Sequence, residues 1–420
     1  MVEPSVEELP RELARAARAV AARLAKTGIR AWIVGGAVRD LMLGRDVHDV
    51  DMVSAALPEQ IEQAFERTIS VGRSFGTVVL PMDGCEVQMA AFRAESGYSD
   101  RRRPDQVRLG VSLEEDAQRR DFTCNALYLD PLTDELRDPV DGRVDLSGRI
   151  LRTVGDPASR FREDGLRLLR LARFEAGLEL GPAEGLHAAA RAERDAMIGV
   201  SAERVLAELG RVFTGQHSPR AMEILDECGL LERILPGDGL AGTDLERRHS
   251  AHGRLPDPPG VNLGLALWLE AQPDSPGQRG LATSLSHAAQ LRTSRELTAR
   301  LADLWRLRRT VSELATGESP RSQRILAMRE PAWTEAHQLA RAWHPELSTE
   351  LEGLEAWRLA LSPAQMKPAA WITSRDLADA GLVPGPEWGE ILRTAERHQL
   401  DGVWDSRDQA LAWVRARASE

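Results

Sequence analysis

Residues 32–53 read Trp32-Ile-Val-Gly35-Gly36-Ala-Val-Arg39-Asp40-Leu-Met-Leu-Gly44-Arg-Asp-Val-His-Asp49-Val-Asp51-Met-Val53. The apolar run before the two glycines predicts a buried strand at 30–34. The glycines predict a turn, the next residues a short helix at 38–43, and residues 47–53 a second strand. The order strand, turn, helix, strand therefore starts an α/β unit.

The second strand would carry two acidic side chains on one face. Side chains alternate faces along a strand, so Asp49 and Asp51 point to the same side. Carboxylates so close repel each other unless a cation lies between them, and Mg²⁺ suits carboxylate and phosphate oxygens. The alternative is a solvated turn or strand end, which is the commoner setting for an isolated Asp-x-Asp.

The glycine-rich turn before the helix is a candidate phosphate cradle. Backbone N–H groups converge at such a turn, and the N-terminus of a helix favours anions. A lone Gly-Gly pair is more often only a tight turn. Combined with the two aspartates, it indicates metal-assisted phosphoryl or nucleotidyl transfer.

Composition places the chain among ordinary globular proteins. Of its 420 residues, 42% are hydrophobic and 28% are charged, which allows two or more domains with sizeable cores. We find no apolar stretch of membrane-spanning length and no signal peptide, so we expect a cytoplasmic protein without membrane contact. Three scattered cysteines predict neither a disulfide nor a zinc site.

Charge alone does not favour nucleic-acid binding, because the formal net charge is −11. Lysine occurs only at positions 26 and 367, so nearly all positive charge is arginine. A GC-rich genome explains most of that bias. Arginine nevertheless makes planar, bidentate phosphate contacts wherever it clusters.

The remaining pattern separates an α/β head of about 150 residues from a helical remainder. Residues 6–27 and 58–67 have helical spacing, and residues 69–93 predict a hairpin around Met82-Asp83-Gly84. Residues 95–108 are polar and basic and predict a loop. Almost every segment from 157 onward has helical periodicity, with long connections near 236–242, 253–260 and 270–280.

A second motif reads Arg119-Arg120-Asp121-Phe122-Thr123-Cys124-Asn125-Ala126-Leu127 and follows an acidic helix start at 112–116. Adjacent arginines can anchor a triphosphate while the aspartate orients them. The alternative is a surface patch of salt bridges.

A third motif reads Glu163-Asp164-Gly165-Leu166-Arg167-Leu168-Leu169-Arg170-Leu171-Ala172-Arg173-Phe174. At helical spacing its three arginines share one arc and most of its leucines the opposite one. Guanidinium groups flanked by apolar side chains need anionic or hydrogen-bonding partners. A nucleotide could supply both, phosphates for the arginines and a base edge for Asp164 with its neighbouring arginine. The alternative is an internal network of ion pairs.

Three further polar residues have weaker patterns. Glu86 lies in a strand that could neighbour the aspartate strand and is a candidate third carboxylate, although an ordinary strand residue is an equal alternative. His249 and His252 have no neighbouring His-Asp pair, so we interpret them as part of a polar loop.

Taken in order, these motifs resemble the class II tRNA nucleotidyltransferases, which comprise the CCA-adding enzymes and their bacterial poly(A) polymerase relatives. The linking segments are similar as well, and so are Val200-Ser-Ala-Glu203-Arg204 and Gly381-Leu-Val-Pro-Gly385-Pro386 downstream. The resemblance covers nearly the whole chain. The strand after Cys85 departs from the family pattern, which leaves Glu86 without an assigned role.

The resemblance implies an α+β fold, with an N-terminal polymerase-β-like nucleotidyltransferase palm followed by an extended all-α neck, body and tail. The palm would occupy residues 1–150 and have a mixed sheet with helices. A nucleotide-selecting neck would occupy 151–215, the helical body 216–330, and a tRNA-binding helical tail 331–420.

The resemblance also implies roles for matched residues. Asp49 and Asp51 would be catalytic and would bind Mg²⁺. Asp164 and Arg167 would read the base edge of CTP or ATP in place of a template. The other predicted nucleotide-binding residues are Gly36, Arg39 and Arg120 for the triphosphate, with Arg170 and Arg173 completing the pocket.

The implied function is template-independent addition of CMP and AMP to the 3′ end of tRNA, with release of pyrophosphate. The partners would be the acceptor end and elbow of tRNA, together with CTP and ATP, and no protein partner is inferred. The alternatives are a CC-only or A-only tRNA nucleotidyltransferase, a poly(A) polymerase, or a catalytically silent tRNA-binding protein.

Overall fold

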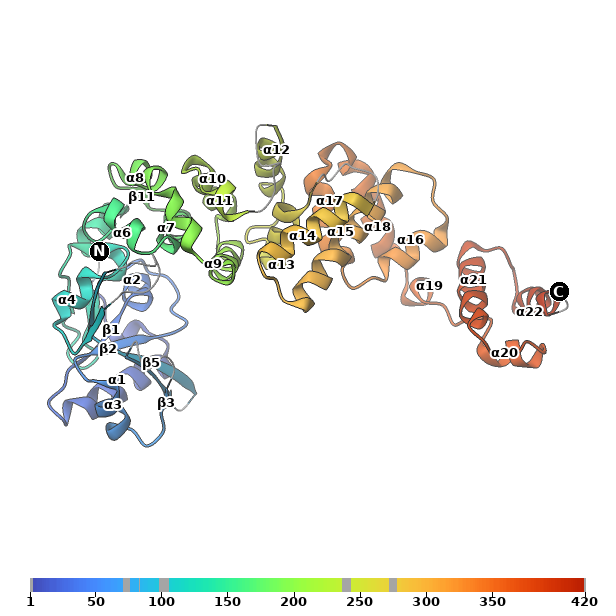
Figure 1. Cartoon of the computed structure of the whole chain (residues 1–420). Helices are drawn as coiled ribbons and strands as arrows, with labels where there is room; N and C mark the ends of the chain where they lie inside the picture. Colours follow the sequence, from blue (N-terminus) through green and yellow to red (C-terminus); the bar gives the residue numbers. More distant parts are fainter. Residues whose placement is uncertain are drawn as a thin grey trace. The chain divides into compact units, whose positions relative to one another are not determined.

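A computed structural model describes residues 3–70, 76–82, 84–97, 106–235, 243–271 and 278–418 of the chain (Figure 1). The chain divides into two compact units, Met1–Pro236 and Gly237–Glu420. The finer boundaries that the sequence predicts at 150, 215 and 330 stay predictions. The basic segment 101–104 and the turn residue 83 lie outside the described residues.

The first unit is built on a seven-stranded sheet with the order β3-β4-β5-β2-β1-β8-β9. The central strands β2 and β5 are parallel, and every other pair in this sheet is antiparallel. The predicted mixed sheet is therefore confirmed. Its strands are β1 Ala31–Val34, β2 Asp51–Ser54, β3 Ile69–Ser70, β4 Thr77–Met82, β5 Cys85–Ala91, β8 Tyr128–Leu129 and β9 Leu136–Arg137.

The register of the central strands aligns three residues across the sheet. Val34 of β1 pairs with Asp51 of β2 on one side and with Tyr128 of β8 on the other. Directly opposed residues of neighbouring strands share a face. The same cluster of buried residues contains Val34, Tyr128, Trp32 and Val53, so the face that carries Asp51 also holds an apolar core.

Helices flank this sheet. The first helix, α1 (Arg11–Ala25), has a buried apolar face and packs on β1, on β5 and on α3 (Pro58–Ala64), as Figure 1 shows in blue. The short helix α2 (Gly36–Met42) begins directly after the glycine turn. The strand–turn–helix–strand order and the β4–β5 hairpin agree with the sequence prediction.

The prediction of a continuous loop at 95–108 was wrong at both ends. β6 (Arg93–Ser96) and β7 (Gln106–Leu109) pair as a separate two-stranded antiparallel sheet. β7, Gln106-Val107-Arg108-Leu109, alternates polar and apolar residues and exposed and half-buried positions, which is a strand signal that the loop prediction missed.

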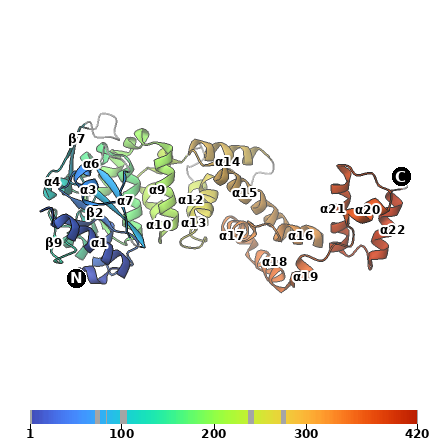
Figure 2. The ribbon, with the colours of Figure 1, turned by 90° about the horizontal axis from the view of Figure 1, so that it is seen from below.

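The rest of the first unit is mainly helical. Helices α7, α9 and α10 pack against one another and are among the green helices of Figures 1 and 2. One short parallel pair, β10 (Ile150–Leu151) with β11 (Gly181–Pro182), interrupts them. The helices are α4 Leu113–Gln118, α5 Gly142–Ser147, α6 Pro157–Glu163, α7 Leu166–Gly177, α8 Leu186–Ala192, α9 Ala202–Thr214, α10 Ser218–Glu227 and α11 Leu231–Ile234, with 3-10 turns at Val6–Glu8, Thr123–Asn125 and Arg194–Gly199.

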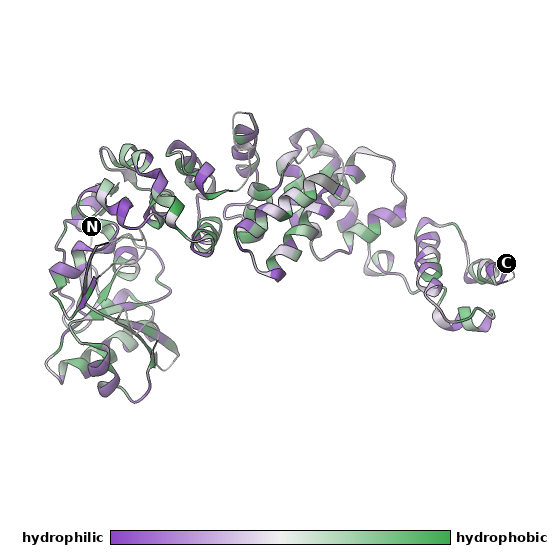
Figure 3. Cartoon of the chain, viewed as in Figure 1, coloured by the Kyte–Doolittle hydropathy of each residue, from purple (hydrophilic) through white to green (hydrophobic). Residues whose placement is uncertain are grey.

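The second unit contains helices and no strand among its described residues. The longest helix, α15, packs against α13, α14, α16, α17 and α18, and most helices carry both purple and green residues in Figure 3. The helices are α12 Thr243–His252, α13 Gly260–Leu269, α14 Gln278–Gln290, α15 Arg295–Thr316, α16 Arg321–Met328, α17 Trp333–Trp343, α18 Ser348–Ala360, α19 Pro363–Met366, α20 Ser374–Asp379, α21 Glu387–Asp401 and α22 Arg407–Arg417, with a 3-10 turn at Pro345–Leu347.

The prediction of a polar loop around His249 and His252 was also wrong. Both lie in α12, where His252 is fully buried. The indole N–H of Trp268 donates to its Nδ1 at 3.1 Å, and both histidine rings pack edge-on against that indole. The buried indole of Trp268 on α13 therefore accounts for the burial of His252 in an otherwise polar segment. None of the helices in the described part of the chain combines the length and apolar character needed to cross a bilayer.

Candidate active site

Two carboxylates lie at the start of β2. Asp51 is its first residue, Asp49 lies two positions before it, and both are exposed. Partial loss of hydration raises the pKa of Asp51, the Asp49 carboxylate raises it further, and Arg120 opposes the shift. The predicted strand at 47–53 therefore begins four residues later, at Asp51, and Asp49 lies before it, although its charge still acts on Asp51.

The glycine turn lies beside this pair. Gly35 has φ +75°, a conformation that L side chains rarely adopt, and it allows β1 to turn directly into α2. A Cβ built on Gly35 would lie 3.9 Å from Nη1 of Arg120, and one on Gly36 would lie 3.6 Å from Nη2 of Arg39. Two guanidinium groups therefore border the turn.

Arg39 is buried on α2 and connects the turn to the second motif. Its guanidinium donates to both carboxylate oxygens of Asp40, at 2.9 and 2.8 Å. Nη1 donates to Oδ1 of Asn125 at 2.8 Å. The amide of Asn125 in turn donates to Oδ1 of Asp121 at 3.1 Å. These bonds fix both ends of the Asn125 side chain.

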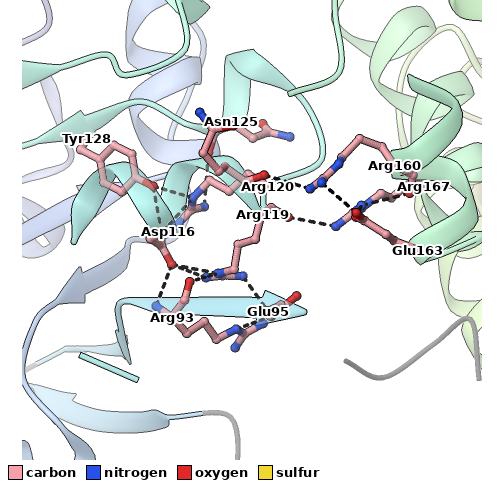
Figure 4. A network of polar contacts seen from close by, with 11 residues as sticks. Arg93, Glu95, Asp116, Arg119, Arg120, Asn125, Tyr128, Arg160, Glu163 and Arg167 are labelled. Carbon is pink, nitrogen blue, oxygen red and sulfur yellow. Dashed lines mark hydrogen bonds and ion pairs between the residues drawn. The ribbon is translucent and has the colours of Figure 1, made fainter. Parts of the chain in front are cut away.

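Arg120 is held by a buried network that Figure 4 shows. Its Nη2 donates to Oδ2 of Asp116 at 2.9 Å, and its Nε donates to the hydroxyl of Tyr128 at 3.0 Å. Asp116 also accepts two hydrogen bonds from Arg119, at 2.6 and 2.9 Å. Burial raises the pKa of the Asp116 carboxyl, but the two arginines outweigh it and keep the pKa below its usual range.

Asp121 joins the sheet unit to α7. Its Oδ2 accepts from Nε of Arg170 at 2.6 Å, and its Oδ1 accepts from the backbone N–H of Phe122 at 2.8 Å. Burial opposes ionisation, but Arg170 and these hydrogen bonds hold the pKa of the Asp121 carboxyl well below its usual range. The acid is thus a fixed anion beside the arginine stripe.

Asp164 precedes α7 and is held by a residue of α9. Arg204 donates to its two carboxylate oxygens at 3.1 and 2.8 Å, a bidentate pair. Oδ1 also accepts the backbone N–H of Leu166 at 3.1 Å. Among the described residues Oδ2 accepts only from Nη2 of Arg204, so it retains a lone pair for a further donor.

Arg167 is buried at the beginning of α7. Its Nη1 donates to the carbonyl of Arg160 at 3.0 Å and to Glu163 at 2.6 Å, and its Nη2 donates to the carbonyl of Arg119 at 2.9 Å (Figure 4). The base-reading candidate is therefore bonded to the residue next to Arg120.

The other two arginines of the stripe and Arg39 surround one aromatic ring. The guanidinium carbons of Arg173, Arg170 and Arg39 lie 4.0, 5.0 and 5.2 Å from the ring centre of Phe174. Arg173 also bonds to Glu208, which is fully buried on α9. Every arginine of the stripe thus has an internal anionic partner, which is the ion-pair alternative that the sequence left open.

A pocket of about 260 Å³ lies next to this cluster. Four arginines and two aspartates contribute to its wall, so it is cationic as well as partly apolar. Its charged and aromatic lining comprises Arg39, Asp40, Arg45, Asp46, His48, Arg173, Phe174 and Arg211. The structure brings Arg39 and Arg173, two of the predicted nucleotide-binding residues, into this wall.

The donor chemistry of Asp49 and Asp51 fits a hard divalent cation, because two mutually repelling carboxylates gain most from one. Glu86 on β5 is exposed, and Gln88, two residues on, pairs with Asp51 in the parallel register. Across the described ranges no group of three or more His, Cys, Asp or Glu residues is arranged to hold a metal. Glu86 therefore does not complete a three-residue site in this structure.

Sequence reasoning assigned no role to four residues that fix the site. Asp116 and Tyr128 hold Arg120, Arg204 holds Asp164, and Glu208 holds Arg173. Arg204 lies in a segment whose family resemblance is visible in sequence. Glu208 and Tyr128 have no local signal, because each meets its partner only in the folded chain.

Family models match two parts of the chain. Residues 31–152 match the poly A polymerase head domain, and residues 182–237 match a probable RNA and SrmB- binding site of polymerase A. The first match contains the two aspartates, the glycine turn and Arg120. The second contains Arg204 and Glu208.

Relatives match over nearly the full length. The chain is 33% identical over 410 residues to the CCA-adding enzyme of Levilactobacillus brevis, covering 97% of this chain and 98% of that one. The crystal structure of the Bacillus stearothermophilus CCA-adding enzyme in complex with CTP superposes with a TM-score of 0.68, 26% identity and 98% coverage of each chain. The Thermotoga maritima CCA-adding enzyme complexed with tRNA has the same fold, with a TM-score of 0.71, 19% identity, and coverage of 98% of this chain and 97% of that one.

Proposed function

The chain belongs to the family of CCA-adding enzymes, and we propose that it adds CMP and AMP to the 3′ end of tRNA, using CTP and ATP and releasing pyrophosphate. The observation that carries the proposal is the repelling pair Asp49 and Asp51 beside a glycine turn bordered by Arg120. A carboxylate pair next to a cationic phosphate cradle is the arrangement that nucleotidyl transfer requires.

Enzymes of this family depend on a metal ion, and we propose Mg²⁺, held by Asp49 and Asp51. When bound, the metal would lower the pKa of the attacking RNA 3′-hydroxyl and balance charge on the α-phosphate. The protein's own contribution is to place the two acids at the beginning of β2, next to the glycine turn that follows β1.

The triphosphate would lie over the turn between β1 and α2. There the backbone of Gly36 and the guanidinium groups of Arg39 and Arg120 would neutralise its charge. The supporting observation is that both arginines border the turn while anchored behind it, Arg39 by Asp40 and Arg120 by Asp116. Anchored donors need little reorganisation when a phosphate arrives.

The base would be selected by Asp164 and Arg167. The 4-amino group of cytosine and the 6-amino group of adenine are donors, and the ring nitrogen beside each is an acceptor. Oδ2 of Asp164 retains an acceptor site. The Arg167 guanidinium is fixed by Arg160, Glu163 and Arg119, and its Nη2 keeps a second N–H as a donor. Uracil and guanine carry a carbonyl where the amino group is needed, so an aspartate would repel them.

Arg170 and Arg173 would complete the pocket through their fixed positions around Phe174. The helical second unit would bind tRNA, with its last part, 331–420, as the segment that contacts the elbow. A cytoplasmic location follows from tRNA as substrate and stays part of the proposal.

Stepwise extension tests the function. Purified full-length protein with Mg²⁺ is given tRNA transcripts that lack one, two or three of the terminal C, C and A, and the products are separated on a sequencing gel. The proposal expects only AMP to be added to the first, CMP and then AMP to the second, and two CMP followed by AMP to the third.

The rival functions give other products. A CC-only enzyme would stop before the terminal A, and an A-only enzyme would extend only the tRNA that ends in CC. A poly(A) polymerase would add many AMP residues to unstructured RNA. No extension together with tRNA binding would indicate a catalytically silent tRNA-binding protein.

A further inference from the structure

Tyr128 is a buried polar residue that contacts Arg120 and has no place in the proposed chemistry of metal, triphosphate and base. It lies on β8, is fully buried, and shares the face of the sheet that carries Asp51, with Val34 between them. Its ring packs edge-on against Phe92, with the centroids 6.3 Å apart. A phenylalanine would fill the same apolar space, so the hydroxyl needs a separate explanation.

The hydroxyl lies between one cation and one anion. It accepts a hydrogen bond from Nε of Arg120 at 3.0 Å and donates one to Oδ2 of Asp116 at 2.9 Å (Figure 4). The guanidinium carbon of Arg120 lies 5.2 Å from the centre of the same ring. One side chain therefore fixes Arg120 both by stacking and by hydrogen bonding.

These contacts restrict Arg120 on the side away from the turn. Nε is shared by Tyr128 and Asp116, Nη2 donates to Asp116, and Nη1 donates weakly to the carbonyl of Asn125 at 3.3 Å. Each Nη atom carries two N–H groups, so both retain one for a ligand, and Nη1 is the atom beside Gly35. Tyr128 and Asp116 therefore hold the guanidinium through Nε and Nη2, and an N–H group of Nη1 stays available next to Gly35.

We propose that Tyr128 is a positioning residue, whose hydroxyl holds the Arg120 guanidinium in the orientation that binds the triphosphate of the incoming nucleotide. It acts through Arg120 and does not touch the substrate. This inference rests on the proposed function, since it takes the ligand of Arg120 to be a triphosphate.

The test compares Tyr128→Phe with a matched control, Phe92→Leu. The first variant removes only the hydroxyl, and the second weakens the same apolar cluster without changing a hydrogen bond of Arg120. KM and kcat are measured for CTP and for ATP on the tRNA substrates above, together with competitive inhibition by inorganic tripolyphosphate. Thermal unfolding is followed in parallel.

Loss of a hydrogen bond to a charged group predicts that Tyr128→Phe raises KM for both nucleotides by about tenfold. The inhibition constant of tripolyphosphate should rise by the same factor, because it has no base. The ratio of CTP to ATP use should not change. Phe92→Leu should lower the unfolding temperature and leave these constants within about twofold, since its effect is on packing.

Other outcomes overturn the inference. They are an unchanged tripolyphosphate constant in Tyr128→Phe, an equal shift in Phe92→Leu, a change confined to one nucleotide, or a Tyr128→Phe protein that does not fold. Wild-type protein that binds tripolyphosphate but extends no tRNA would instead refute the proposed function, so the two failures are distinguishable.

Discussion

Replacing Asp121 by asparagine should loosen the connection between the sheet and α7. The carboxylate accepts hydrogen bonds from Phe122 N, Asn125 Nδ2 and Arg170 Nε, and Nη2 of Arg170 lies 2.5 Å away as an ion pair. Asparagine has one acceptor oxygen, so either Arg170 or the pair Phe122 and Asn125 would face an N–H₂ group instead. Asp121→Asn keeps the volume and removes the charge.

The magnitude follows from burial. Breaking a buried ion pair by removing one partner costs about 3–5 kcal/mol. The Asp121 side chain is 10% exposed, but that of Arg170 is 29% exposed, so water partly compensates the arginine. We therefore expect the lower end, about 3 kcal/mol, and a coupling energy of about 2 kcal/mol in a double-mutant cycle with Arg170→Gln.

The pH dependence has a defined sign. The pKa of Asp121 is lower in the folded chain than in the unfolded one. Its contribution is therefore fully present above the unfolded value of about 4. That contribution is lost as the pH falls through about 4 and below, towards the folded pKa. Asp121→Asn should have a flatter stability profile between pH 6 and pH 3.

Native-state hydrogen exchange read by mass spectrometry is the suitable assay, because nine of the ten tryptophans lie in the second unit and do not report on the first. Peptides that cover α2 and α7 should exchange faster in Asp121→Asn, and peptides of the second unit should not. A change below about 0.5 kcal/mol, or additive effects of Asp121→Asn and Arg170→Gln, would refute the reasoning.

Three further changes have distinct readouts. Gly35→Ala should raise KM for CTP and ATP, because φ +75° strains an L residue by about 1–3 kcal/mol and so distorts the turn. An unchanged KM in steady-state kinetics would argue against triphosphate binding at the turn between β1 and α2. Arg204→Met should lower discrimination of CTP over UTP by about tenfold, since Asp164 loses a bidentate charge-assisted pair. Competition between the two nucleotides measures the discrimination, and an unchanged ratio would exclude a role of Arg204 in orienting Asp164. Burial, helped by His249, lowers the pKa of His252 to about 4, so the unfolded chain binds the proton first as the pH falls. The wild-type protein should therefore lose about 3 kcal/mol of unfolding free energy between pH 6.5 and pH 4, and His252→Gln should not. Unfolding followed by tryptophan fluorescence at several pH values measures this loss, and equal pH profiles of the two proteins would contradict it.

Local patterns predicted the parts of the fold that local forces decide. Gly35 requires a backbone conformation that few residues tolerate, so the turn between β1 and α2 could be placed from sequence. The helical periodicity after 157 likewise reflects packing within and between neighbouring helices. β6 and β7 were missed, because each is only four residues long and adjoins a polar, basic segment, so the alternation in Gln106–Leu109 covers few positions.

The partners of the site residues could not be predicted in the same way. Arg170 meets Asp121 and Arg173 meets Glu208 across 49 and 35 positions of the chain. Such pairs depend on how the helices pack, which no spacing rule gives. The arginine stripe was recognised as needing anions, but the structure was required to identify them. The buried environment of His252 depends in the same way on Trp268.

The central claim is that Asp49 and Asp51 together carry out nucleotidyl transfer. Its most direct measurement is the single-turnover rate of CMP incorporation by Asp49→Asn and Asp51→Asn, with tRNA affinity measured on the same preparations. We expect both variants to bind tRNA within about twofold of wild type and to lose at least about 10³-fold in rate, because each removes a carboxylate that we propose as a metal ligand. Incorporation at the wild-type rate by either variant would contradict the account.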